Sequence, residues 1–260
     1  MESLMRITLL ALALLVTTLT VLSLGGGAQT LQKLPPATSA TTGPVVAELF
    51  TSQSCSSCPP AEKLFSDLAT RDDLIVLEWH VDYWDRLVHG RAGAWKDPYS
   101  SPDYTARQRQ YNRALRGTGG AYTPQAVING AAETVGNRAG EVERLLSNAP
   151  HAMAPIEVSN TGASTRVEIA AFDVALNRSA EIFQLTLLPE QSTSVPRGEN
   201  RGVHLFSRNV VLDATQIGTY HGDALSFNIE TPPANHGCAI IIQERRGNRL
   251  GPILGASYCS

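Results

Sequence analysis

The pattern of apolar and polar positions changes near residue 151. Before that point, apolar runs of strand length alternate with segments whose apolar residues recur every three or four positions. These are the periods of buried strands and amphipathic helices, and their alternation predicts an α/β layered domain over residues 44–150. The predicted strands cover residues 44–50, 74–81 and 122–129, and the predicted helices cover residues 59–70, 103–116 and 139–149.

Beyond this boundary, the chain consists of short runs in which apolar and polar residues alternate, separated by turn residues at fairly regular spacing. This pattern is typical of antiparallel strands in a β-sandwich. We therefore expect a smaller all-β, sandwich-like domain over residues 151–260, following the α/β domain.

The N-terminal segment has the three parts of a secretory signal. Arg6 precedes an apolar stretch over residues 7–24, and small residues follow it up to Ala28. This order predicts a signal peptide over residues 1–28, with an uncleaved membrane anchor as the alternative. Residues 29–43 are rich in Thr, Ala and Pro and predict a flexible linker. We expect a periplasmic or secreted protein that does not contact the membrane once the signal is cleaved.

Composition and charge indicate a globular protein. Of the residues, 43% are hydrophobic and 17% are charged, and the net charge is -3. Because there is no basic excess, no nucleic-acid partner is expected. The chain has four cysteines, and export would place them in a compartment where disulfides form and persist.

The tetrapeptide Cys55-Ser56-Ser57-Cys58 lies between a predicted strand and a predicted helix. Backbone N–H groups at a helix start favour a thiolate, which is the form that attacks a disulfide. We therefore expect Cys55 to be the more exposed, more acidic nucleophile and Cys58 to resolve the mixed disulfide. A permanent structural disulfide is the alternative. No metal is expected, because the sequence has no second C-x-x-C and no H-x-x-x-H.

Thr123-Pro124 stands at the head of a predicted strand, where proline is unusual because it cannot donate to a sheet ladder. A trans proline on an edge strand is one interpretation. The motifs ELFTSQSCSSCPPAE, HVDYWD, RQRQY and YTPQAVING together give another, and RGENRG and GPILGAS agree with them. Together they resemble a family of secreted bacterial thioredoxin-like proteins catalogued as a domain of unknown function.

This resemblance implies a thioredoxin-like fold in the first domain. It also implies that Pro124 is cis and lies opposite the cysteines, and that the backbone of Thr123 binds a partner chain. Ordinary thioredoxins differ from this sequence, which has Ser54 before the first cysteine, Ser-Ser between the cysteines and a long insertion before Pro124. The resemblance therefore implies neither a substrate nor a reducing or oxidising direction.

Other polar residues are secondary candidates. Glu48 could exchange a proton with Cys58, although strand alternation turns it to the other side. His80 could be a third ligand if the cysteines bind Cu(I). The remaining candidates are Asp82, Trp84 and Asp85, which could flank the cysteines or pack the insertion, and Arg107, Arg109 and Tyr111, which could form a lid or a solvated helix face.

Cys238 and Cys259 flank the turn RGNRLG, and their midpoint falls between Asn248 and Arg249. A hairpin folded at that turn places the two cysteines opposite each other, at a separation that a disulfide can span. We therefore predict a structural disulfide between them.

Together these features predict an exported thiol–disulfide oxidoreductase that acts on protein thiols or disulfides. Cys55 attacks, Cys58 resolves, and Thr123 and Pro124 hold the partner. No dissociable cofactor is required, although a redox recycling partner is expected. A non-catalytic thioredoxin-fold binding module and a copper-delivery protein are the alternatives.

Overall fold

The computed structural model describes residues 32–33, 43–87, 93–151, 154–160, 164–172 and 180–259. The predicted signal peptide lies outside the described residues, as does most of the predicted linker. Within that linker, however, β1 (Gln32–Lys33) pairs antiparallel with a strand near the C-terminus, at Ser226 and Leu225. None of the helices in the described part of the chain has the length and apolarity needed to cross a bilayer.

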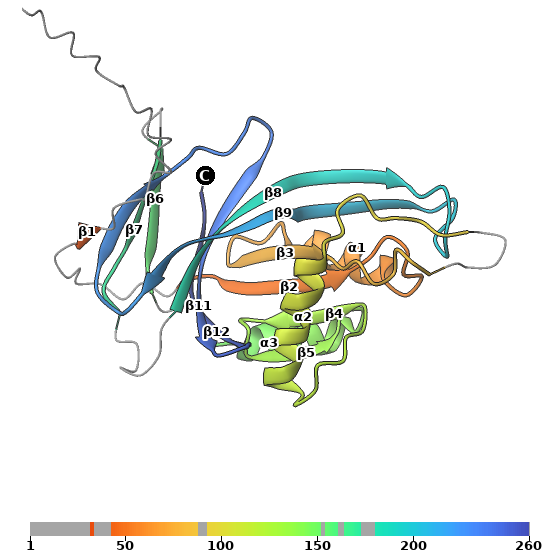
Figure 1. Ribbon diagram of the computed structural model, residues 1–260, viewed down its shortest axis with the longest axis horizontal. Helices are drawn as coiled ribbons and strands as arrows, with labels where there is room; N and C mark the ends of the chain where they lie inside the picture. Colours follow the sequence, from red (N-terminus) through yellow and green to blue (C-terminus); the bar gives the residue numbers. More distant parts are fainter. Residues whose placement is uncertain are drawn as a thin grey trace, which may run out of the picture.

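The first half alternates strands and helices, as its periodicity predicts (Figure 1). The elements are β2 (Val45–Thr51), α1 (Pro59–Leu68), β3 (Leu74–His80), α2 (Pro102–Leu115), β4 (Gln125–Ile128), β5 (Ala132–Val135) and α3 (Ala139–Asn148). The strands β2 and β3 are parallel, β4 runs antiparallel to β2, and β5 completes a hairpin with β4.

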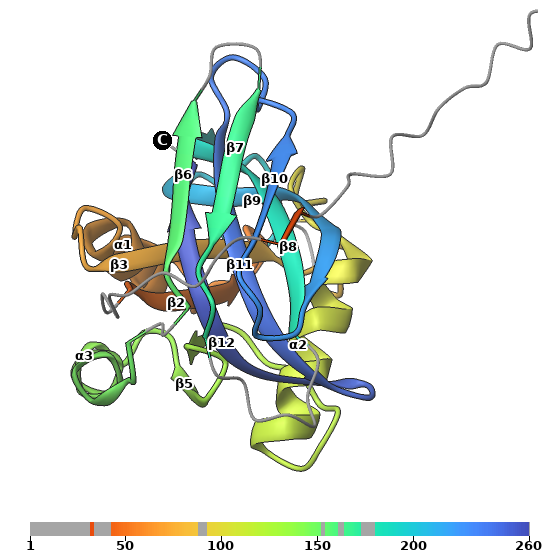
Figure 2. The same cartoon turned by 90° about the vertical axis from the view of Figure 1, so that its left-hand side faces the viewer.

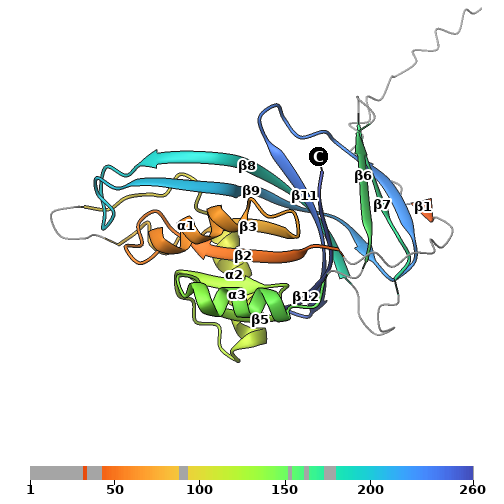
Figure 3. The ribbon, with the colours of Figure 1, turned by 180° about the vertical axis from the view of Figure 1, so that it is seen from behind.

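Side-chain alternation along β2 determines which helix covers each face of the sheet. Val45, Ala47 and Leu49 pack with apolar residues of α1 and α3, which lie together on the face seen in Figure 3. Val46 and Phe50 point to the opposite face, where α2 and strands from the second half cover them. Every residue of β2 is buried, as expected for a strand covered on both faces.

The second half consists of strands, again as predicted. They are β6 (Ile156–Asn160), β7 (Thr165–Ile169), β8 (Ala180–Ser194), β9 (His204–Tyr220), β10 (Leu225–Ile229), β11 (Gly237–Arg246) and β12 (Arg249–Tyr258). Four strands form a small antiparallel sheet in the order β1-β10-β7-β6. This sheet packs against β8, β11 and β12 through a shared apolar cluster, as a sandwich does (Figure 2).

The two halves share one large mixed sheet, in the order β12-β11-β8-β9-β3-β2-β4-β5. The connection is a parallel pairing of β9 with β3 at Val210 and Glu78. Leu185 and Val211 from the second half pack in the same core as Trp79 from the first. The structure therefore differs from the division expected at residue 151, because the sheet and its core continue across that position. Alternation within each strand is a local signal and does not reveal this pairing.

Candidate functional site

The disulfide between Cys55 and Cys58 lies where β2 gives way to α1. Cys58 is the N-cap of α1, and its N–H bonds to the carbonyl of Cys55 at 3.1 Å, which closes a tight turn. Pro59 and Pro60 form the first turn of the helix, where N–H groups have no helical acceptor and proline is tolerated. The Cα atoms of the two cysteines are 5.4 Å apart, within the range for a disulfide.

Thr123 lies directly against the sulfur of Cys55. Its hydroxyl donates to Cys55 Sγ at 3.3 Å and accepts from Trp84 Nε1 at 2.8 Å. The hydroxyl of Ser57 donates to the carbonyl of Thr123 at 3.5 Å. The peptide bond from Thr123 to Pro124 is cis. The structure thus brings together the four residues that the sequence predicts to form a redox site, Cys55, Cys58, Thr123 and Pro124.

The expectation that Cys55 would be the exposed cysteine is wrong for this disulfide state, because both cysteines are 0% exposed. Residues 197–202, which join β8 to β9 and which we call the covering loop, contact the backbone of the segment that carries them. Asn200 Nδ2 donates to the carbonyl of Cys55 at 2.9 Å, and Glu199 Oε2 accepts from the N–H of Ser56 at 3.0 Å. The position of Cys55 at a helix start did not reveal this burial, because contacts from residues distant in the sequence contribute to it.

A buried acidic residue lies one helical turn after Cys58. Glu62 is 2% exposed, and its Oε1 accepts from the hydroxyl of Thr51 at 2.7 Å. Burial, and then the nearby carboxylate of Glu78, raise the pKa of Glu62 to about 8. Our sequence interpretation did not identify Glu62, although its i+4 spacing from Cys58 was the available signal.

His80 belongs to the same buried group. Its Nδ1 lies 2.6 Å from Asp97 Oδ2, and its Nε2 lies 3.6 Å from Glu78 Oε1. Burial opposes the charged form, but Asp97 and then Glu78 outweigh it and raise the pKa of His80 well above its usual value. Asp97 also accepts from the N–H of Gln53 at 2.8 Å, which ties this group to the segment that leads into Cys55.

Three secondary candidates, Glu48, Arg107 and Tyr111, lie in a separate network on the α2 side of the sheet. Arg107 Nη2 donates to Glu48 Oε1 at 2.7 Å, and the hydroxyl of Tyr111 donates to Glu48 Oε2. Glu48 is therefore bound to α2, so its suggested exchange of protons with Cys58 is not supported. Arg107 and Tyr111 anchor α2 to the sheet instead of forming a mobile lid, whereas Arg109 is exposed.

The polar residues after β3 fasten the insertion. Thr105 donates to Asp82 at 2.6 Å, and Ser100 donates to Asp85 at 2.6 Å. No group of three or more His, Cys, Asp or Glu side chains in the described ranges is arranged to hold a metal ion. Because both ring nitrogens of His80 face carboxylates, the copper alternative has no third ligand there.

The second disulfide joins Cys238 and Cys259 across neighbouring strands. The N–H of Cys259 donates to the carbonyl of Cys238 at 2.9 Å. The disulfide and this hydrogen bond together tie the end of the C-terminal strand β12 to the start of β11. Two disulfides indicate a non-cytoplasmic location, since such bonds persist mainly in oxidising compartments.

Comparisons with known proteins identify relatives but no activity. The crystal structure of a protein from Agrobacterium tumefaciens, a structural-genomics target, matches with a TM-score of 0.70 and 28% sequence identity, covering 85% of this chain and 95% of that one. No curated protein matches. Residues 46–243 match a family described as protein of unknown function, DUF1223. Because this match covers most of the sequence, including both halves of the large sheet, the chain belongs to the DUF1223 family.

Proposed function

We propose that this protein is an exported thiol–disulfide oxidoreductase, periplasmic or secreted, that acts on protein thiols or disulfides. The observation that carries the proposal is the contact at 3.3 Å between Cys55 Sγ and the hydroxyl of Thr123, the residue before cis Pro124. This contact supports the proposal, because it joins a disulfide at a helix start to the residue whose backbone we expect to bind a partner chain.

The order of elements supports a thioredoxin-like interpretation of the first half. A parallel β2–α1–β3 unit is followed by α2 and then by the antiparallel hairpin β4–β5 and α3. The cysteines lie beyond the carboxyl end of β2, which is where ligands bind in open α/β sheets.

The proposed reaction exchanges one disulfide for another. In the reducing direction, the thiolate of Cys55 attacks a partner disulfide, forms a mixed disulfide and releases one partner thiolate. The thiolate of Cys58 then attacks Cys55 Sγ, releases the second partner thiolate and forms the Cys55–Cys58 bond. The oxidising direction is the reverse. Glu62 is largely protonated at neutral pH and is suited to exchange a proton with the thiol of Cys58, one helical turn away.

Trapping of mixed disulfides tests this function. Cys58→Ala should accumulate mixed disulfides with partner proteins, because the resolving thiol is absent, whereas Cys55→Ala should accumulate none or far fewer. The matched control is the double variant Cys238→Ala/Cys259→Ala, which leaves the redox pair intact and should trap nothing. Mass spectrometry of the linked peptides identifies the attacking sulfur. Equal trapping by Cys58→Ala and Cys55→Ala would contradict the proposed roles.

The reduction potential of the Cys55–Cys58 pair determines the direction. A value of about -120 mV would indicate an oxidant, and a value of about -270 mV would indicate a reductant.

The burial of both sulfurs favours one alternative, a binding module with an inert cysteine pair. Under that alternative, neither single variant traps a partner, and a small thiol reduces the buried pair no faster than it reduces Cys238–Cys259.

A further inference from the structure

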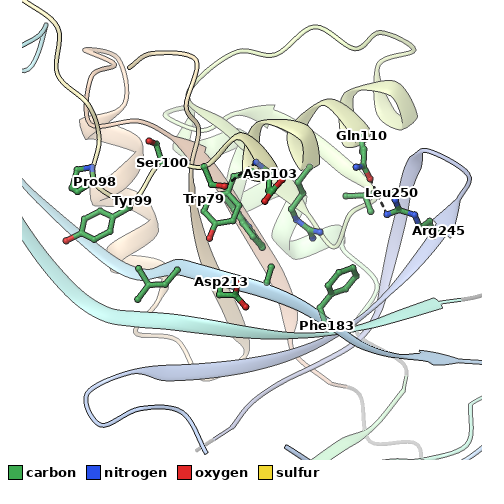
Figure 4. Close-up of a pocket in the computed structure, with 15 residues that line it drawn as sticks. Trp79, Pro98, Tyr99, Ser100, Asp103, Gln110, Phe183, Asp213, Arg245 and Leu250 are labelled. Atoms are coloured by element: carbon green, nitrogen blue, oxygen red, sulfur yellow. Dashed lines mark hydrogen bonds between the residues drawn. The ribbon is translucent and has the colours of Figure 1, made fainter. Parts of the chain in front are cut away.

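A second site lies on the α2 side of the large sheet, apart from the cysteine pair. A cavity of about 370 Å³ opens between α2, β8 and β9 (Figure 4). This volume falls within the usual range for small-molecule sites. Asp103 of α2 lies on one side and Asp213 of β9 on the other. None of the cysteine-site contacts uses these two carboxylates, so the cavity is available for another ligand.

The charged side chains that line the cavity are two aspartates and two arginines, and the two aspartates are the ones without an ion-pair partner among the described residues. Arg107 pairs with Glu48 at 2.7 Å, and Arg245 pairs with Glu181 at 3.2 Å, so both arginines are already neutralised. Asp103 and Asp213, by contrast, make no ion pair with a described residue. Burial, and then the carboxylates of Asp213 and Asp103 in turn, raise the pKa of the Tyr104 hydroxyl, so both carboxylates act on this residue of the cavity wall.

Aromatic side chains supply the other surface that organic cations prefer. The cavity is lined by Tyr99, Tyr104, Phe183 and Trp79. A ring face attracts an ammonium group through its quadrupole, and the attraction strengthens when water is partly excluded. A metal ion would gain little from these rings, whereas an ammonium group of a small molecule gains from the rings and the carboxylates together.

A buried donor in the cavity wall gives an independent indication of a ligand. Trp79 is 0% exposed, and its indole N–H has no hydrogen-bond partner in the described part of the chain. Leaving such a buried donor without an acceptor is energetically unfavourable. The ring of Trp79 is held in place by the guanidinium of Arg107, 4.7 Å from its centroid, and by an edge contact with Tyr104. A ligand with an acceptor atom would satisfy this N–H.

We propose that this cavity binds a small organic cation, with its ammonium group between Asp103 and Asp213 against the ring of Tyr104 and an acceptor atom toward the indole N–H of Trp79. The site is separate from the thiol–disulfide chemistry and does not depend on it.

Calorimetric titration of the full chain with choline tests the proposal, because choline carries a quaternary ammonium and a hydroxyl acceptor. Its neutral isostere, in which a carbon atom replaces the nitrogen, is the matched ligand control. We expect choline to bind at least about tenfold more tightly than the isostere. Equal affinities, or no saturable binding up to about 10 mM choline, would overturn the proposal.

Substitutions then locate the site. Asp213→Asn and Asp103→Asn should each weaken choline binding about threefold to tenfold. Asp72→Asn, in the turn before β3, makes the same charge change away from the cavity and should leave binding unchanged. If Asp72→Asn weakens binding as much as the two cavity variants, the attraction is a general charge effect and the proposal fails.

The indole N–H signals provide a second readout. The chain has three tryptophans, and signals assigned through Trp84→Phe and Trp95→Phe leave that of Trp79 by elimination. Choline should shift the Trp79 signal and leave the other two in place. A shift confined to Trp84 or Trp95 would place the ligand at the cysteine site and overturn the assignment to this cavity.

Discussion

At the scale of single residues, Glu62, Glu78 and His80 form a buried group of titratable side chains with few hydrogen bonds. Glu62 Oε2, Glu78 Oε2 and His80 Nε2 are buried and have no hydrogen-bond partner within the described ranges. Burial without such partners penalises the ionised form of a carboxyl group. The neutral form of Glu62 therefore persists well above the pH at which an exposed glutamate ionises, with a pKa of about 8.

This raised pKa predicts a pH-dependent contribution to stability. The folded state holds a proton on Glu62 that the unfolded chain releases near its usual pKa of 4.5. The contribution is therefore fully present below about pH 4.5 and is lost as the pH rises through about 8. For Glu62→Gln, the free energy of unfolding should fall less steeply over this window, by up to about 1.4 kcal/mol per pH unit.

Urea unfolding across this pH window measures the slope. Glu141→Gln is the control, since Glu141 lies on the exposed face of α3 and pairs with Arg144 at 2.9 Å. If Glu62→Gln and Glu141→Gln retain the same pH dependence as the unsubstituted chain, the raised pKa of Glu62 is wrong.

At the scale of elements, the covering loop connects the β-rich half to the segment that carries the Cys55–Cys58 disulfide. Asn200 Nδ2 donates to the carbonyls of Gln53 and Cys55, both at 2.9 Å. Gly198 adopts a positive φ of 78°, and a Cβ atom there would lie 3.2 Å from Trp95 Cβ. The covering loop is therefore fastened to the backbone of the segment that carries Cys55. We expect movement of the loop to increase access to the cysteines.

Loosening the loop should expose the disulfide. Asn200→Ala removes two hydrogen bonds worth about 0.5–1.5 kcal/mol each, so reduction of Cys55–Cys58 by a small thiol should be about tenfold faster. Arg201→Ala is the control, because that side chain is exposed and makes no hydrogen bond or ion pair with a described residue. The measurement is the rate of thiol release. An unchanged rate in Asn200→Ala would show that the loop does not limit access.

The sequence predicted most elements but few of their contacts. Helix and strand periods are local, so β2, α1, β3 and α2 lie where their patterns place them. The hairpin partner β5 was missed, because only four residues, AETV, form it and all are partly exposed. The covering loop, RGENRG, entered the sequence analysis only through the family resemblance. Its contact with Cys55 depends on the length of the β8–β9 hairpin, which the local pattern does not give. The cysteines and Thr123-Pro124 were found because each has a short, self-contained signal.

At the scale of the whole molecule, polar side chains join the two halves in addition to the shared apolar core. Arg107 donates to Glu48 of β2 and also to Gln243 of β11, at 2.8 Å. The hydroxyl of Tyr258 accepts from the N–H of Val76 at 3.0 Å, which ties the last strand to β3. Strand order within a sheet follows from such long-range contacts. For this reason the sequence pattern alone did not reveal that one sheet continues across residue 151.

The shared sheet predicts that residues 43–151 do not fold alone. In the isolated segment, the core around Trp79 and Phe50 would lose its contacts with Leu185, Leu187 and Val211. Each such residue contributes about 1.5–3 kcal/mol when fully buried, and a domain is stable by only about 5–15 kcal/mol in total. The segment should therefore bind an apolar dye and unfold in urea without a cooperative transition.

The matched control for this experiment is residues 43–260, which retain the whole large sheet and should unfold cooperatively under the same conditions. Segment 43–151 should also lose the acceptor that Gln243 provides for Arg107, leaving a buried charge less well satisfied. A sharp transition in segment 43–151, with tryptophan emission as blue-shifted as in the control, would show that the first half is an independent domain. The pairing of β9 with β3 would then be a docking contact between two domains instead of part of one core.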